Sequence, residues 1–157
     1  HRASANEEVK MALRRGCYWK ISGSAFKLEI FKEVGYFSDK YPYAGDYYWF
    51  LRFLAKGKKV SYLPKALLIN RNHESSIAGL AHRNDKDIKE FLSILNEHVE
   101  YVSIRFIILF HLKRLEYIFR RILRDLTKGK LYHALGRLTT ASFIFKNAYL
   151  SISKKKT

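Results

Sequence analysis

The sequence predicts an α/β segment over residues 1–80, followed by an all-helical segment over residues 81–157. Both prolines, Pro42 and Pro64, lie in the first segment, together with short runs of alternating apolar residues that are typical of strands. In the second segment, apolar residues recur at spacings of three and four, which indicates amphipathic helices. We therefore expect two domains that join near residues 79–84.

Strands are expected at two places in the first segment. Residues 19–26 are short and strand-like, with Gly23 as a point of close approach. Residues 59–70 alternate apolar side chains and are interrupted by Pro64, so they predict two short strands, or one strand and an edge. These strands give the α/β class.

Two helices are expected between those strands. Residues 28–34 have helical spacing and stop at Gly35, a common glycine position at the end of a helix. Asp46 is expected to open the second helix, which runs to residue 56 and stops at Gly57.

Three helices are expected in the second segment. Their apolar stripes cover residues 88–102, 112–126 and 131–145. Asn84 or Asp85 is expected to cap the first of them, and Gly129 to end the second.

Composition excludes some classes of protein. A hydrophobic content of 48% excludes a disordered chain, and the single Cys17 excludes a disulfide framework or a cysteine-based zinc site. The thiol suits a reducing compartment, so we expect a cytoplasmic location. The 30 Lys and Arg against 14 Asp and Glu give a net charge of +16, which predicts an anionic partner such as nucleic acid, an acidic membrane or a phosphorylated substrate.

Asp46 stands out among the acidic residues because of its neighbours. An Asp that follows a glycine at the start of a helix is most often an N-cap. Five aromatic residues surround this one in sequence, and aromatic rings beside a carboxylate can hold a sugar, although they also serve as core. They are Tyr41, Tyr43, Tyr47, Tyr48 and Trp49.

The order of motifs between residues 16 and 76 resembles glycosyltransferase family 2, which has the GT-A fold. Five pieces occur in the family's order, each weak alone, and the resemblance does not extend into the later helices. They are Ile-Ser-Gly-Ser-Ala-Phe at 21–26, Val-Gly-Tyr-Phe at 34–37, Gly-Asp followed by an aromatic helix ending in Leu-Arg at 45–52, Tyr-Leu-Pro at 62–64, and Arg-Asn-His-Glu-Ser-Ser at 71–76.

The resemblance implies that residues 1–80 are the acceptor-side half of a GT-A fold, with short strands and two helices. It places Asp46 as the general base of an inverting transfer from a nucleotide-sugar to a hydroxyl acceptor, such as a glycan or lipid-linked glycan in polysaccharide or glycolipid assembly. Many family members have Glu before this Asp, where this chain has Gly45.

The resemblance also implies the other site residues. Gly23, Ser24, Tyr47, Tyr48 and Trp49 are expected on the acceptor side. Arg71 and His73 are expected near the donor diphosphate, with His73 as a candidate ligand of a divalent metal, Mg²⁺ or Mn²⁺.

The donor-binding half is expected to lie outside this sequence, which starts at His1 and suggests a fragment. The family's Asp-x-Asp metal motif has one counterpart, Asp85-Lys86-Asp87, which follows the acceptor motifs and looks like the start of a helix. We therefore expect these residues alone to bind no metal or nucleotide-sugar tightly.

The basic helix over residues 101–128 predicts a second kind of contact. Its cations fall mostly on one side and its apolar residues on the other, as in a helix lying on an anionic membrane, or simply in a packed helix with a solvated face. Nucleic acid is a competing partner, disfavoured because no known nucleic-acid-binding motif is present. A basic non-catalytic binding module and a pseudoenzyme scaffold remain alternatives to the enzyme. The cations are Arg105, Lys113, Arg114, Arg120, Arg121, Arg124 and Lys128.

Overall fold

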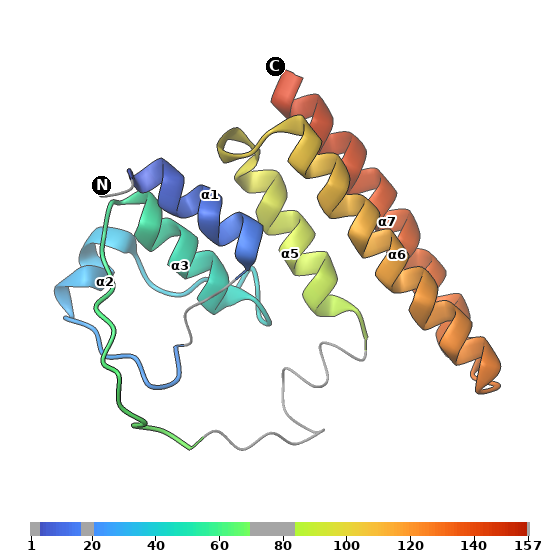
Figure 1. The fold of residues 1–157 in the computed structure, drawn as a ribbon, viewed down its shortest axis with the longest axis horizontal. Coiled ribbons are helices and arrows are strands. Elements are labelled where there is room, and N and C mark those ends of the chain that lie inside the picture. The colour runs from blue at the N-terminus through green and yellow to red at the C-terminus, as the bar shows by residue number, and fades with distance from the viewer. Residues whose placement is uncertain (1–3, 17–20, 70–83, 157) are drawn as a thin grey trace. The chain divides into compact units, whose positions relative to one another are not determined.

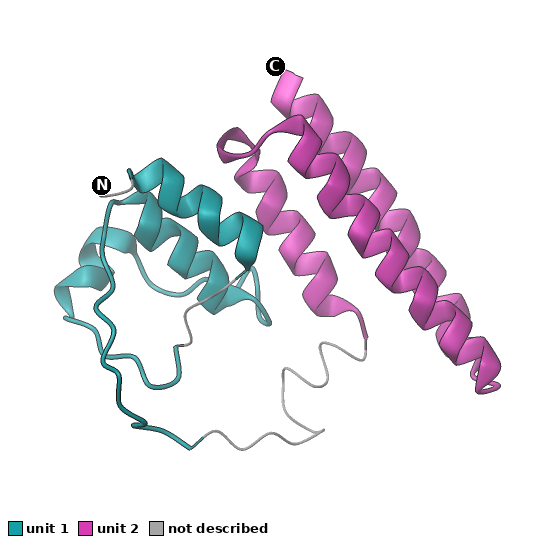
Figure 2. Ribbon diagram, viewed as in Figure 1, with its two compact units in different colours: residues 1–80 teal, residues 81–157 magenta. Residues whose placement is uncertain are grey.

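The computed structural model describes residues 4–16, 21–69 and 84–156. These residues form six α-helices, one 3₁₀ turn and no β-strand (Figure 1). The α/β class predicted for the first segment is therefore wrong for the residues that the structure describes. The chain divides into two compact units, residues 1–80 and 81–157 (Figure 2).

The first unit is built on two packed helices, α1 (Ala5–Arg15) and α3 (Gly45–Ala55). Ser4 caps α1, because its hydroxyl accepts a hydrogen bond from the Glu7 amide at 3.3 Å. The buried face of α1 meets α3, where the Tyr47 hydroxyl donates to the Ala12 carbonyl at 3.2 Å. This bond fixes the start of α3 against the last part of α1.

The short helix α2 (Glu29–Val34) ends at Gly35, as the sequence predicts. Gly35 has φ 85° and ψ 170°, a backbone conformation that is essentially restricted to glycine. Two side chains of α3 bind the carbonyls at this end of α2. Trp49 Nε1 donates to the Gly35 carbonyl at 2.6 Å, and the Arg52 guanidinium donates to the carbonyls of Val34 and Tyr36.

The segments expected to be strands are irregular where the structure describes them. Residues 21–24 form a turn, closed by a hydrogen bond from the Ser24 amide to the Ile21 carbonyl at 3.0 Å, with Gly23 at φ 87°. Residues 59–69 belong to no regular element and expose apolar side chains such as Tyr62, at 87%. A strand needs a neighbour that satisfies its backbone groups, and alternation alone does not supply one.

The second unit contains the three helices that the sequence predicts. They are α5 (Lys86–Glu97), α6 (Ile104–Thr127) and α7 (Leu131–Lys156), with the 3₁₀ turn η1 (Val99–Tyr101) between α5 and α6. Helices α6 and α7 form a long hairpin (Figure 1) that turns at Gly129, as predicted, where φ is 67°. Helix α5 packs mainly on α7, and the shared core contains Ile88, Leu92, Ile118 and Ile144.

A buried ionic network joins all three helices of the second unit. Asp85 accepts hydrogen bonds from Arg121 at 2.6 Å and from Arg137 at 2.7 and 2.9 Å. Arg137 also donates to Asp125 at 2.6 Å, which lowers the pKa of the Asp125 carboxyl. All four side chains are buried, and two positive charges balance two negative charges.

The network corrects two expectations. Asp85 does occupy the position before α5, but its side chain makes no capping hydrogen bond, because the carboxylate is bound to the two arginines. Arg121, expected among the outward cations of the basic helix, is buried in the same network.

We predict that Asp85→Ala lowers the free energy of unfolding by about 3–5 kcal/mol, because it removes the counter-charge of the buried Arg121 and leaves the buried Arg137 paired with Asp125 alone. Urea titration followed by circular dichroism measures this loss. The matched control is Glu116→Ala, which removes an exposed partner of Arg120 and should change stability by less than about 0.5 kcal/mol. Equal stabilities of the two variants would contradict the role of the network.

We predict that Gly35→Ala lowers the free energy of unfolding by about 1–3 kcal/mol. The added methyl group would be forced into a glycine-only conformation and would collide with the Arg52 guanidinium. Gly45→Ala is the control, because its φ is not positive and the nearest atom to its new methyl group is 3.5 Å away. Thermal unfolding of both variants distinguishes them, and a Gly35→Ala variant as stable as the control would refute the argument.

Candidate functional site

Asp46 lies in the first turn of α3, which begins at Gly45. Ala44 occupies the N-cap position, so the prediction that Asp46 is the N-cap is wrong. Its carboxylate is half-buried, and Oδ1 accepts a hydrogen bond from the Tyr47 amide at 2.7 Å. The unpaired amides at this end of α3 favour a negative charge there.

The loop before Asp46 is held by aromatic contacts. Tyr41 is buried, and its ring meets Tyr48 edge to face at 4.9 Å. On its other side, the Tyr48 ring lies 5.9 Å from the Arg52 guanidinium. Tyr48, two residues after Asp46, is half-buried, so part of its side chain reaches the surface.

The other two aromatic residues expected on the acceptor side lie in the core. Tyr47 is 4% exposed and Trp49 is 1% exposed. The Trp49 ring is 5.2–5.5 Å from four phenylalanine rings, and its indole N–H is bound to Gly35. These two side chains therefore position α3, and Tyr48 is the member of the trio with exposed area. The four rings belong to Phe26, Phe31, Phe37 and Phe53.

Gly23 and Ser24 lie in the turn at 21–24, apart from any regular element. A Cβ at Gly23 would meet Leu68 at 3.8 Å, an ordinary contact, so the glycine is required by its positive φ rather than by close approach. Arg71 and His73 lie outside the described residues. Within the described part of the chain, no group of three metal-ligating side chains comes together.

The most informative residue that the sequence reasoning passed over is Arg52. It stands in the Leu-Arg pair that ends one of the motifs, and the structure shows it bound to the carbonyls of Val34 and Tyr36. The signal available in the sequence is its position six residues after Asp46, on a helix rich in aromatics. Arg52 links the end of α2 to the helix that carries the carboxylate.

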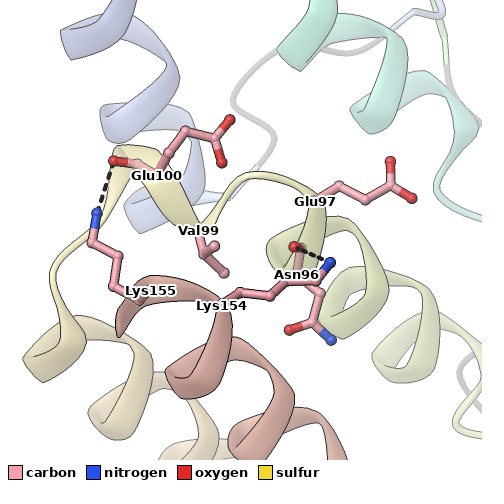
Figure 3. Close-up of a pocket in the computed structure, with 6 residues that line it drawn as sticks. All are labelled: Asn96, Glu97, Val99, Glu100, Lys154 and Lys155. Carbon is pink, nitrogen blue, oxygen red and sulfur yellow. Dashed lines mark hydrogen bonds between the residues drawn. The ribbon is translucent and has the colours of Figure 1, made fainter. Parts of the chain in front are cut away.

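A separate open hollow of about 710 Å³ lies in the second unit (Figure 3). Two lysines of α7 reach across it: Lys154 donates to the Asn96 carbonyl at 3.2 Å, and Lys155 to the Glu100 carbonyl at 3.0 Å. With Glu97 and Glu100 also on its wall, the hollow has mixed charge. It contains none of the residues that the sequence singles out.

Comparison of the chain with protein-family models, with curated proteins and with solved structures found no match. The resemblance to glycosyltransferase family 2 therefore depends on the motifs themselves. Within the described ranges, no helix has the length and apolar character needed to cross a bilayer.

His111 is a buried titratable group of the second unit that lies outside the ionic network. Its Nδ1 donates to the Ile107 carbonyl at 2.7 Å, and Nε2 is buried without a partner among the described residues. Burial lowers the pKa of His111 from its usual value near 6.5. The folded protein thus disfavours protonation of this imidazole.

We predict that stability falls as the pH is lowered through about 6.5, because the unfolded chain then binds a proton on His111 that the folded chain resists. His111→Leu should remove this component of the pH dependence. Urea midpoints between about pH 8 and 5 measure it, with the exposed His133→Gln as control. A His111→Leu variant that keeps the wild-type pH profile would show the prediction to be wrong.

Proposed function

We propose that residues 1–80 are the acceptor-side part of an inverting glycosyltransferase in which Asp46 is the general base. The observation that carries the proposal is the setting of Asp46. Its carboxylate is half-exposed at the positive end of α3, and Oδ1 is oriented by the Tyr47 amide. In the described part of the chain this bond is the carboxylate's one interaction, which leaves Oδ2 for a proton.

The frame around Asp46 suits this role because a general base must be held in a fixed position. Three anchors hold α3: Tyr47 on α1, Trp49 on the Gly35 carbonyl, and Arg52 on the end of α2. All three come from the motif at 45–52 that contains Asp46. A carboxylate fixed in this way can approach one hydroxyl repeatedly in the same geometry.

The chemistry asked of Asp46 is proton removal. An alcohol is a weak nucleophile, so Asp46 would take the acceptor's proton as its oxygen attacks the anomeric carbon of the nucleotide-sugar. Attack from the face opposite the leaving nucleoside diphosphate inverts the configuration of that carbon. Tyr48, the half-buried aromatic two residues after Asp46, would contact the acceptor sugar.

The donor's diphosphate would be held elsewhere. The resemblance implies a divalent metal at the donor diphosphate, and in the described ranges no three metal-ligating side chains come together. Arg71 and His73 are the residues of this sequence that we assign to the donor phosphates. The acceptor would be a glycan or lipid-linked glycan.

We predict that Asp46→Asn in the full-length enzyme lowers kcat by at least about 10²-fold and leaves donor affinity unchanged. Asn keeps the hydrogen bond from the Tyr47 amide but does not accept a proton. The measurement is release of nucleoside diphosphate with a panel of nucleotide-sugars and hydroxyl acceptors. The control is Asp39→Asn, an exposed carboxylate in the preceding loop.

Asp39→Asn should have wild-type turnover. If Asp46→Asn also keeps wild-type turnover while remaining folded, Asp46 is not the base.

A further inference from the structure

The α6–α7 hairpin has polar groups inside and large apolar groups outside. Charged and polar side chains are buried between its helices and against α5, whereas many leucine, isoleucine, phenylalanine and tyrosine side chains face outward. The buried polar set is His111, Arg121, Asp125, Arg137, Thr140, Asn147 and Ser151. The exposed apolar set, which we call the outer face, is Ile108, Leu109, Leu112, Phe119, Leu123, Leu126, Leu131, Tyr132, Leu135, Leu138, Phe145, Tyr149 and Leu150.

The outer face is organised along the helices. On α7, Leu131, Leu135, Leu138, Phe145 and Tyr149 recur at intervals of three, four and seven residues, so they form one stripe. Phe145 is 64% exposed and its neighbours on the stripe are similar. Soluble monomers rarely expose an apolar surface of this extent, so a partner is indicated.

Few charges interrupt that stripe. Between residues 131 and 153, the charged side chains are Arg137, which is buried, and Lys146. Helix α7 therefore has an outward surface that is almost uncharged over most of its length. Such a surface suits an apolar medium.

Charge identifies the partner. Residues 101–157 contain 13 Lys and Arg against Glu116 and Asp125, a net charge of +11. Exposed cations follow outer-face residues in sequence, among them Lys113 and Arg124 on α6 and Lys128 at its C-cap. A second copy of the chain would carry the same charge of +11 in this region and would therefore repel the first. A membrane with anionic lipids offers both an apolar interior and the opposite charge.

A nucleic acid would interact favourably with the cations of this surface but not with its apolar side chains. Phosphates would pair with the cations, but the outer face is mainly aliphatic, and single-stranded bases stack on aromatic rings. Aliphatic side chains that remain in water gain nothing from such a complex. An amphipathic hairpin in a lipid interface uses both kinds of residue.

We propose that the α6–α7 hairpin lies in the interface of an anionic membrane, with the outer face in the acyl boundary and the cations at the headgroups. The hairpin lies on the bilayer and does not span it. The inference is independent of the proposed transferase activity. It extends the membrane contact expected for residues 101–128 to α7, which contributes the less charged stripe.

The seam explains how the hairpin keeps its fold while its apolar residues contact lipid. Arg137 bonds to Asp85 and Asp125, and Arg121 bonds to Asp85, so cohesion comes partly from buried ion pairs. The leucines of the outer face are 40–59% exposed, so a large part of each side chain is available to lipid while the hairpin stays folded.

The test is co-sedimentation with vesicles of phosphatidylcholine that contain about 30% phosphatidylglycerol. We expect the variant Phe119→Ser/Leu138→Ser/Phe145→Ser to bind at least about tenfold more weakly than wild type, since three large apolar side chains that would contact lipid are removed. Circular dichroism should show an unchanged helix content, because all three side chains are exposed. The matched control is Leu28→Ser/Tyr62→Ser, two exposed apolar residues of the first unit, which should bind as wild type.

A charge variant separates the two components of binding. Lys113→Gln/Arg124→Gln/Lys128→Gln should weaken binding to the anionic vesicles about fivefold per cation at low salt, and should leave the weaker binding to pure phosphatidylcholine unchanged. Tyr132→Trp supplies a reporter at an 86% exposed position of α7, whose emission should shift to the blue on vesicles.

Three results would overturn the proposal. The first is an apolar variant that binds anionic vesicles as tightly as wild type. The second is a dimer in solution that the apolar variant dissociates, which would make the outer face a contact between copies. The third is oligonucleotide binding that is stronger than vesicle binding at moderate salt and is lost in the apolar variant.

Discussion

The buried ionic network is the constraint on which the second unit depends. Asp85 sits at the start of α5, Arg121 on α6 and Arg137 on α7, so one carboxylate ties three helices together. A pair of charges taken out of water is costly unless each finds a partner in good geometry, and here every charge has one. The register of the hairpin follows from this requirement, because sliding α6 along α7 would separate Arg137 from Asp125. Apolar side chains tolerate such slips better; some of them form the shared core with Ile118 and Ile144, and many others lie on the outside.

In the first unit, hydrogen bonds from side chains to backbone carbonyls, rather than buried ion pairs, set the positions of the helices. Its helices are short, and their relative positions are set by side chains of α3 that bind backbone carbonyls, with Trp49 on Gly35 and Arg52 on Val34 and Tyr36. Directional bonds of this kind fix orientation better than apolar contact alone. The turn of α3 that carries Asp46 is thereby connected to α1 and α2, which is what a positioned carboxylate requires.

Features encoded locally could be predicted from the sequence. The helical periods and the stops at Gly35 and Gly129 depend on residues within one or two turns, and the structure confirms them. The strands depended on pairing between distant segments, and the alternation at 59–69 contains no information about a partner. Arg121 looked like a solvent-facing cation because its counter-ion, Asp85, is 36 residues away. Tyr47 and Trp49 beside Asp46 fitted both a binding surface and a core, and only their burial separates these roles.

The hairpin has buried polar side chains and exposed apolar side chains, and this distribution affects the solubility of the protein. The buried ionic residues that link the helices and the exposed apolar residues of the outer face are different sets. Helix packing and the polarity of the surface can therefore be changed separately. Polar replacements along the stripe from Leu131 to Tyr149 would yield a chain that stays dispersed in aqueous buffer with its helices intact. The same separation means that natural sequence drift on this surface can change the exposed apolar area without altering how the protein folds.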